Sequence, residues 1–190
     1  KTAKIETDNP APLNDRRWVH LCRFWDKAGT KGGGAYTVGL LLGRWRYDDG
    51  PRDGSEDVWW VLHIERGQWD AGDRERHIVD TAKRDGRRVV VGIEQEPGSG
   101  GKESAQLTVK RLAGHRVRVM PAVGTKEDRA DSWATMVNMG AFRMAAGEWN
   151  TAFIDELRYF PHSTYKDQVD AGSGAFAVCA TGVRRVGAAH

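Results

Sequence analysis

The stretch "WVHLCRFWDKAGTKGGGAYTVGLLLGRW", Trp18 to Trp45, decides the fold class. It begins with an apolar and aromatic run that ends at Asp26, and such a run is typical of a strand in the centre of a sheet. The glycine-rich segment 29–34 then supplies a turn, and 36–42 is a second β-rich run. A third β-rich run covers 57–67. Three consecutive strands joined by loops predict an antiparallel meander.

Beyond residue 70, segments with helical spacing alternate with two short apolar strands, 88–93 and 116–120. Helices are expected over 70–84, 103–112, 126–139, 149–157 and 167–180. This order predicts an α/β fold with a central, mixed, five-stranded sheet flanked by helices. Residues 1–17, with few apolar positions, are predicted to be a linker or arm, and 18–190 a single domain.

The bulk properties exclude several classes of protein. The 190 residues carry 29 basic and 26 acidic side chains, and the net charge of +3 gives only weak support for a nucleic-acid partner. Cys22 and Cys179 lie far apart in apolar segments, which favours buried thiols in a cytosolic setting over a disulfide or a zinc site. No signal peptide and no long apolar run is visible, so we expect no membrane partner.

The segment "VVVGIEQEPGSGGKES", Val89 to Ser104, has some features of a phosphate-binding loop. The pattern G-x-x-x-x-G-K-[ST] would need Gly at 96 and Ser or Thr at 103, but the chain has Glu96 and Glu103. The match therefore fails twice, and a flexible turn before a helix is the simpler interpretation. Its backbone N–H groups could still contact a nucleic-acid phosphate.

Carboxylates stand where strands end and where the last helix begins. Asp26 closes the first strand and Glu94 the strand over 88–93, so the two would share one sheet edge if the strands are neighbours. Asp167 and Asp170 are spaced i, i+3 on one face of the last helix. The alternatives stay open: an acid at a strand end usually faces water, and Asp167 could cap its helix.

Clustered carboxylates repel one another, so such a cluster persists only with a compensating cation. Hard oxygen ligands with few histidines favour Mg²⁺ or Mn²⁺ over zinc. Two such ions about 4 Å apart would activate a water and stabilise the leaving oxygen of a phosphodiester.

From Arg23 to Phe176 the chain resembles the C-terminal nuclease domain of the large terminase subunit of tailed bacteriophages. The resemblance is carried, in order, by "RFWDKAGTKGGGAYTVGLLLGR", "VVVGIEQEPGSGGK", "TKEDRADSW", "GAFRMAAGEW" and "FPHSTYKDQVDAGSGAF". It implies an RNase H-like fold and a metal-dependent endonuclease that cuts double-stranded DNA with little sequence preference during viral genome packaging. It also implies the host cell cytoplasm as the location.

The resemblance also implies roles for the acids. Asp26 matches the family's first-strand acid, Glu94 its second-strand acid and Asp170 the acid of its last helix. These three are the predicted catalytic residues and the ligands of two divalent cations, Mg²⁺ or Mn²⁺. In this scheme Asp26 bridges both ions, Glu94 and Asp170 hold one each, and Asp167 is an auxiliary metal ligand. Glu96 is the alternate to Glu94.

Basic side chains are candidates for DNA contact. Lys126 and Arg129 are expected on one helix face that could contact the DNA backbone, with solvated surface as an equal alternative. Lys102 and Lys166 complete the predicted nucleic-acid-binding set. His162 is the histidine nearest the predicted site, and its role is open.

The family's full-length protein also has an N-terminal ATPase motor, with the portal and the small terminase subunit as partners. The present chain begins at Lys1 and has no Walker-type motif, so we expect an excised nuclease domain without that ATPase domain. One rival is another RNase H-like nuclease, such as a Holliday-junction resolvase. A second rival is a non-catalytic DNA-binding or docking module.

Overall fold

The computed structural model describes residues 4–5, 10–29, 32–50, 56–122 and 126–181. Its strands form one seven-stranded sheet in the order β1-β7-β4-β3-β2-β5-β6. The strands are β1 (Lys4–Ile5), β2 (Trp18–Asp26), β3 (Thr37–Trp45), β4 (Val58–Gly67), β5 (Val90–Gln95), β6 (Arg116–Pro121) and β7 (Phe142–Met144). The helices are α1 (Ala71–Asp85), α2 (Gly98–Arg111), α3 (Lys126–Asn138), α4 (Asn150–Tyr159) and α5 (Asp167–Thr181).

The sheet is mixed, as the sequence predicts. Strands β2, β3 and β4 form the expected antiparallel meander. Strand β5 pairs with β2 in parallel, and β6 pairs with β5 in parallel. The prediction of an α/β fold is therefore confirmed, with two more strands than the five expected.

The two additional strands are short. Strand β7 has three residues and pairs in parallel with β4, while the two-residue β1 pairs with β7. A run of two or three residues cannot show the alternation by which longer strands are recognised. These two strands form because they pair with strands distant in sequence, β7 with β4 and β1 with β7, and not because of a local sequence pattern.

Helix α2 begins at Gly98, five positions before the expected start at 103, so "GSGG" forms a helical turn and not a flexible one. Pro97 stands at the N-cap in an extended conformation, where its missing N–H costs nothing. A side chain at position 101 would overlap the backbone of Glu96. The glycine cluster therefore allows the helix to start directly against the end of β5.

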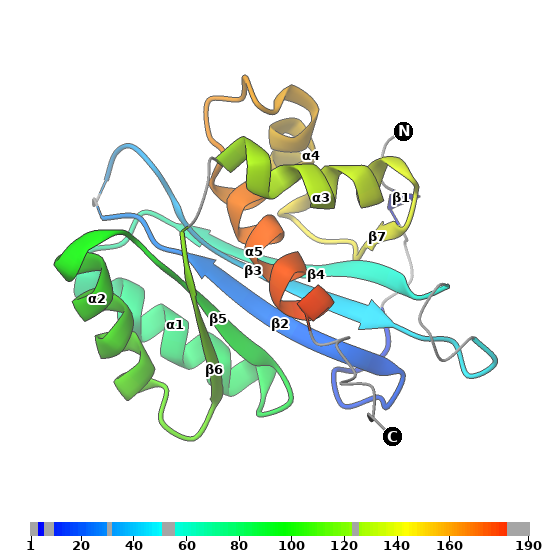
Figure 1. Cartoon of the computed structure of the whole chain (residues 1–190), viewed down its shortest axis with the longest axis horizontal. Helices are drawn as coiled ribbons and strands as arrows, with labels where there is room; N and C mark the ends of the chain where they lie inside the picture. Colours follow the sequence, from blue (N-terminus) through cyan, green and yellow to red (C-terminus); the bar gives the residue numbers. More distant parts are fainter. Residues whose placement is uncertain (1–3, 6–9, 30–31, 51–55, 123–125, 182–190) are drawn as a thin grey trace, which may run out of the picture.

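Helices cover both faces of the sheet, and alternate residues of β2 divide between them. Phe24 packs in the core beneath α3, α4 and α5, whereas Trp25 packs with Ile78 of α1 and Ala105 of α2 on the opposite face. Figure 1 shows α5 lying over β2 and β3, with α3 and α4 beyond it. Among the described residues, no helix is long and apolar enough to cross a lipid bilayer.

The close approach of α5 to the sheet depends on two glycines, which have no side chain to fill the space. A Cβ atom at Gly92 of β5 or at Gly174 of α5 would overlap the ring of Phe24. The ring thus fills the space between two glycines, one in the sheet and one in the helix. This contact sets how near α5 lies to β2 and β5.

Gly174→Ala tests that packing. The added methyl group has no room beside Phe24, so we expect the free energy of unfolding to fall by about 1–3 kcal/mol, the usual cost of overpacking a core. Urea denaturation measures the change. Gly100→Ala is the matched control, because position 100 is also helical but open, and alanine there should stabilise by about 0.5–1 kcal/mol. Equal effects at the two positions would contradict this account.

Candidate metal centre

The parallel pairing of β2 with β5 determines where two of the predicted acids lie. The last registered pair is Trp25 with Ile93, and Asp26 and Glu94 are the next residues of their strands. Phe24 and Gly92 face α5, and side chains alternate along a strand, so Asp26 and Glu94 also belong to the α5 face. The two strands are neighbours, as the sequence argument requires.

The third predicted acid comes from α5. Asp170, which is only 3% exposed, lines a cavity of about 310 Å³ together with Glu94. Asp128 and Ser132 of α3 line the same cavity. Asp128 was not predicted from the sequence, because the segment "KEDRAD" offers several acids and no pattern to choose among them. The cavity therefore brings together carboxylates from β5, α3 and α5.

A buried carboxylate holds the start of α5 in place. Glu156 of α4 accepts hydrogen bonds from the backbone N–H groups of Gln168, at 2.7 Å, and Val169, at 2.9 Å. Burial raises the pKa of Glu156, and these hydrogen bonds oppose that rise. Asp167 accepts a hydrogen bond at 2.8 Å from the backbone N–H of Tyr36, which ties α5 to the segment before β3. Asp170 therefore extends from a firmly anchored first turn.

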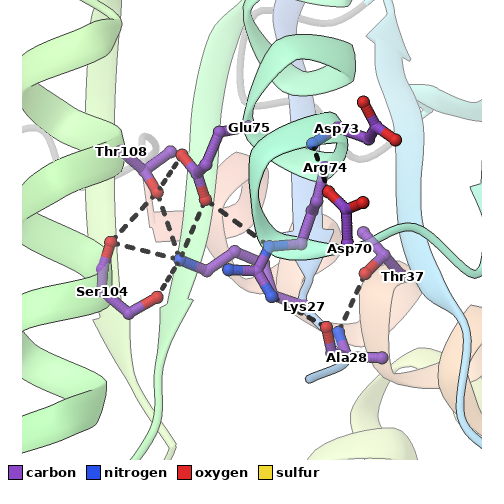
Figure 2. A network of polar contacts seen from close by, with 9 residues as sticks. All are labelled: Lys27, Ala28, Thr37, Asp70, Asp73, Arg74, Glu75, Ser104 and Thr108. Atoms are coloured by element: carbon purple, nitrogen blue, oxygen red, sulfur yellow. Dashed lines mark hydrogen bonds and ion pairs between the residues drawn. The ribbon is translucent and has the colours of Figure 1, made fainter. Parts of the chain in front are cut away.

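Lys27, the residue after Asp26, points to the opposite face of the sheet. Its amino group lies 2.8 Å from the hydroxyl of Ser104, 3.1 Å from that of Thr108 and 3.8 Å from a carboxylate oxygen of Glu75. Figure 2 shows this network between α1 and α2. Burial lowers the pKa of Lys27, and the charge of Glu75 opposes that change. The end of β2 is thus anchored on the face away from Asp26.

The segment after Lys27 is fixed by further polar contacts. Arg74 donates a hydrogen bond to the carbonyl of Ala28 at 2.8 Å, and its Nε lies 3.5 Å from Glu75. The N–H of Ala28 donates to the hydroxyl of Thr37 at 2.9 Å. These contacts are also drawn in Figure 2. They restrict the chain just after the strand end that carries Asp26.

Two of the other predicted residues, Glu96 and Lys102, do not line this cavity. Glu96 follows β5 and is exposed. Lys102 is exposed on α2, which packs on the face of the sheet opposite α5. Lys126 and Arg129 belong to α3, but their side chains lie outside the described part of the structure.

Two candidates lie near the start of α5. Lys166 is half-buried, and its carbonyl accepts a hydrogen bond from the N–H of Asp170 at 3.0 Å. His162 is exposed and lines a different cavity, shared with Tyr36 and Arg66. It does not line the cavity that contains Glu94 and Asp170.

The chemistry of the donors fits hard divalent cations. Glu94, Asp128 and Asp170 offer oxygen ligands only, the kind that Mg²⁺ and Mn²⁺ prefer. Within the described ranges, no three His, Cys, Asp or Glu side chains lie close enough together to form a ready-made metal site. Clustered carboxylates repel one another, and a bound cation would offset that repulsion.

The comparison with protein families decides which family the chain represents. The family model of the terminase RNase H-like domain matches residues 24–177, from β2 into α5. The chain belongs to the terminase RNase H-like domain family. This confirms the resemblance found in the sequence. None of the curated proteins compared with the chain matches it.

Solved structures share the fold of this terminase domain at low sequence identity. The large terminase nuclease from thermophilic phage G20c with bound zinc has 15% identity, coverage of 93% of both chains and a TM-score of 0.61. The human cytomegalovirus terminase nuclease domain, soaked with Mn, has 10% identity, coverage of 85% of this chain and 83% of that one, and a TM-score of 0.58. The fowlpox virus Holliday junction resolvase has 12% identity, coverage of 85% and 98%, and a TM-score of 0.50.

Glu75→Gln tests the anchor beneath the terminase domain's candidate centre. The change leaves the buried Lys27 without its carboxylate, so we expect a loss of about 3 kcal/mol in the free energy of unfolding, measured by urea denaturation. Glu65→Gln is the control, because the Arg84 partner of Glu65 is 62% exposed and such pairs contribute less than about 1 kcal/mol. A loss at Glu75 no larger than that at Glu65 would show that the network is not an anchor.

Proposed function

We propose that this domain hydrolyses phosphodiester bonds of double-stranded DNA, using two divalent cations held by Asp26, Glu94 and Asp170. The observation that carries the proposal is the shared cavity of Glu94 and Asp170, with Asp26 beside Glu94 through the pairing of β2 and β5. Bound Mg²⁺ or Mn²⁺ would lower the pKa of an attacking water and offset negative charge on the leaving oxygen.

The protein's own contribution is a preorganised set of acids on rigid elements. Asp26 and Glu94 stand at the ends of paired strands, and Asp170 is in the first turn of a helix that Glu156 holds. In the proposed roles Asp26, Glu94 and Asp170 would hold the two ions, with Asp26 shared between them and Glu94 and Asp170 each serving one. Asp167, one turn before Asp170 and outside the lining of the cavity, would assist the second ion, and Asp128 of α3 is a further carboxylate in that lining.

The relatives support divalent cations as cofactors. The phage G20c nuclease is described with bound zinc and with bound magnesium, and the cytomegalovirus domain after soaking with Mn. Membership of the terminase family supports a role in viral genome packaging. We propose that the domain works in the host cell cytoplasm as part of a longer protein with an ATPase domain, which would engage the portal and the small terminase subunit.

A second candidate function is the cleavage of branched DNA. It is favoured by the likeness to the fowlpox virus resolvase, which at a TM-score of 0.50 is weaker than the likeness to the terminase nucleases. Cleavage of a four-way junction in preference to linear duplex would support that alternative. Binding of DNA without metal-dependent cleavage would support a non-catalytic module.

Glu94→Gln and Glu96→Gln form a matched pair of tests. Both changes keep the shape of the side chain and remove one charge, but only Glu94 lines the cavity shared with Asp170. We expect plasmid cleavage to fall by orders of magnitude for Glu94→Gln, with little change in the far-ultraviolet circular dichroism spectrum, and to fall much less for Glu96→Gln. A larger loss at Glu96 would mean that the second ligand has been assigned to the wrong residue.

The domain should cut without nucleotide. Because the chain has no Walker-type motif, plasmid cleavage should require Mg²⁺ or Mn²⁺, stop with EDTA and be unaffected by ATP. Agarose gels of supercoiled plasmid report nicking and linearisation. A strict requirement for ATP would contradict the assignment of a self-contained nuclease.

A further inference from the structure

Strand β6, at the end of the described sheet, presents two arginines on the face that carries the acids. Its register pairs Arg116 with Val90, Arg118 with Gly92 and Met120 with Glu94. Val117 and Val119 pack with the core beneath α1 and α2. Because side chains alternate along a strand, Arg116, Arg118 and Met120 belong to the α5 face. The two arginines therefore lie in a row with Met120, the neighbour of Glu94 on the adjacent strand.

The two arginines line a cavity of their own. It has a volume of about 350 Å³ and is bounded by His20 of β2 and by Val178 and Cys179 near the end of α5. The acidic cavity lies farther along the same strands and includes Glu94 and Met120. Since α5 contributes to both, the two cavities follow one another between β6 and α5.

The charge on this cavity is not neutralised within the described residues. Arg116 and Arg118 are both exposed, and neither forms an ion pair with any described carboxylate. Burial lowers the pKa of His20, and the charges of Arg44 and Arg116 lower it further. The two cavities between β6 and α5 therefore differ in charge: one is lined by Arg116 and Arg118, and the other by Glu94 and Asp170.

We propose that Arg116 and Arg118 bind backbone phosphates of the DNA strand that is cut, on one side of the metal centre. The proposal rests on the nuclease function proposed above. Residues two apart on a strand are separated by about 6.6 Å, a spacing comparable with that of successive phosphates along a nucleic-acid strand. Arg118 would hold the phosphate nearer the cations, and Arg116 the next one. Guanidinium groups suit this task because they bind phosphate oxygens in a bidentate manner.

Exposed arginines at a sheet edge also have another common role, and the test must distinguish that role from phosphate binding. Charged side chains on an edge strand prevent pairing with the edge of a second molecule. That use predicts self-association when the charges are removed. It predicts no specific loss of DNA binding.

The experiment compares three proteins: wild type, Arg116→Gln/Arg118→Gln and the control Lys110→Gln/Arg111→Gln. The control also removes two exposed positive charges without a described ion pair, but from α2, on the opposite face of the sheet. Fluorescence anisotropy of a labelled duplex, in EDTA and over a series of salt concentrations, gives the affinity without cleavage. Cleavage of linear duplex with Mn²⁺ and the elution volume in size-exclusion chromatography are measured in parallel.

The arginine variant should bind about tenfold more weakly than wild type at low salt, and its plot of log affinity against log salt should be less steep by about two, since two phosphate contacts are lost. The control should match wild type in both. Equal behaviour of the two variants, or self-association of the arginine variant with normal DNA binding, overturns the proposal. Wild type that binds DNA but does not cut it with Mn²⁺ overturns the nuclease function instead, and the anisotropy data still decide the role of the arginines.

Discussion

The parallel pairing of β2 with β5 is the constraint on which the candidate centre depends. It joins two segments about 70 residues apart, and its register places Asp26 beside Glu94 at the ends of the strands. A slip of one residue would turn one of these acids to the face of α1 and α2, because strand side chains alternate. The fit of Phe24 against Gly92 and Gly174 opposes such a slip and holds α5, with Asp170, close to the same strand ends.

The alternation of side chains along β2 also places a carboxylate and an amino group on opposite faces of the sheet. Asp26 belongs to the α5 face, while the next residue, Lys27, is buried among Glu75, Ser104 and Thr108 on the other (Figure 2). A lysine amino group on the α5 face would compete with metal ions for the carboxylates. On the opposite face it anchors the strand end instead. The carboxylates proposed to bind metal therefore lie on one face of the sheet. The contacts of Lys27 that anchor the end of β2 lie on the opposite face.

The sequence predicted the long elements well because each carries its own pattern: the apolar run of β2, the meander that follows it and the five helices. It did not predict β1 and β7, which are too short to show alternation, or the helical start at Gly98, where close packing on Glu96 outweighs the low helix propensity of glycine. Glu94 and Asp170 were predicted as site residues from their positions at element ends, and the structure places both in one cavity. Asp128 was not, because its place in the cavity depends on how α3 packs against α5, which no local pattern encodes.

The central claim is that Asp26, Glu94 and Asp170 together hold two divalent cations. Anomalous diffraction from crystals soaked in Mn²⁺ tests it directly, since Mn²⁺ scatters anomalously and can be located without reference to the protein density. The account predicts two peaks about 4 Å apart, as in other two-metal sites, between the ends of β2 and β5 and the first turn of α5. Peaks that lie away from these three carboxylates in well-soaked crystals would contradict it.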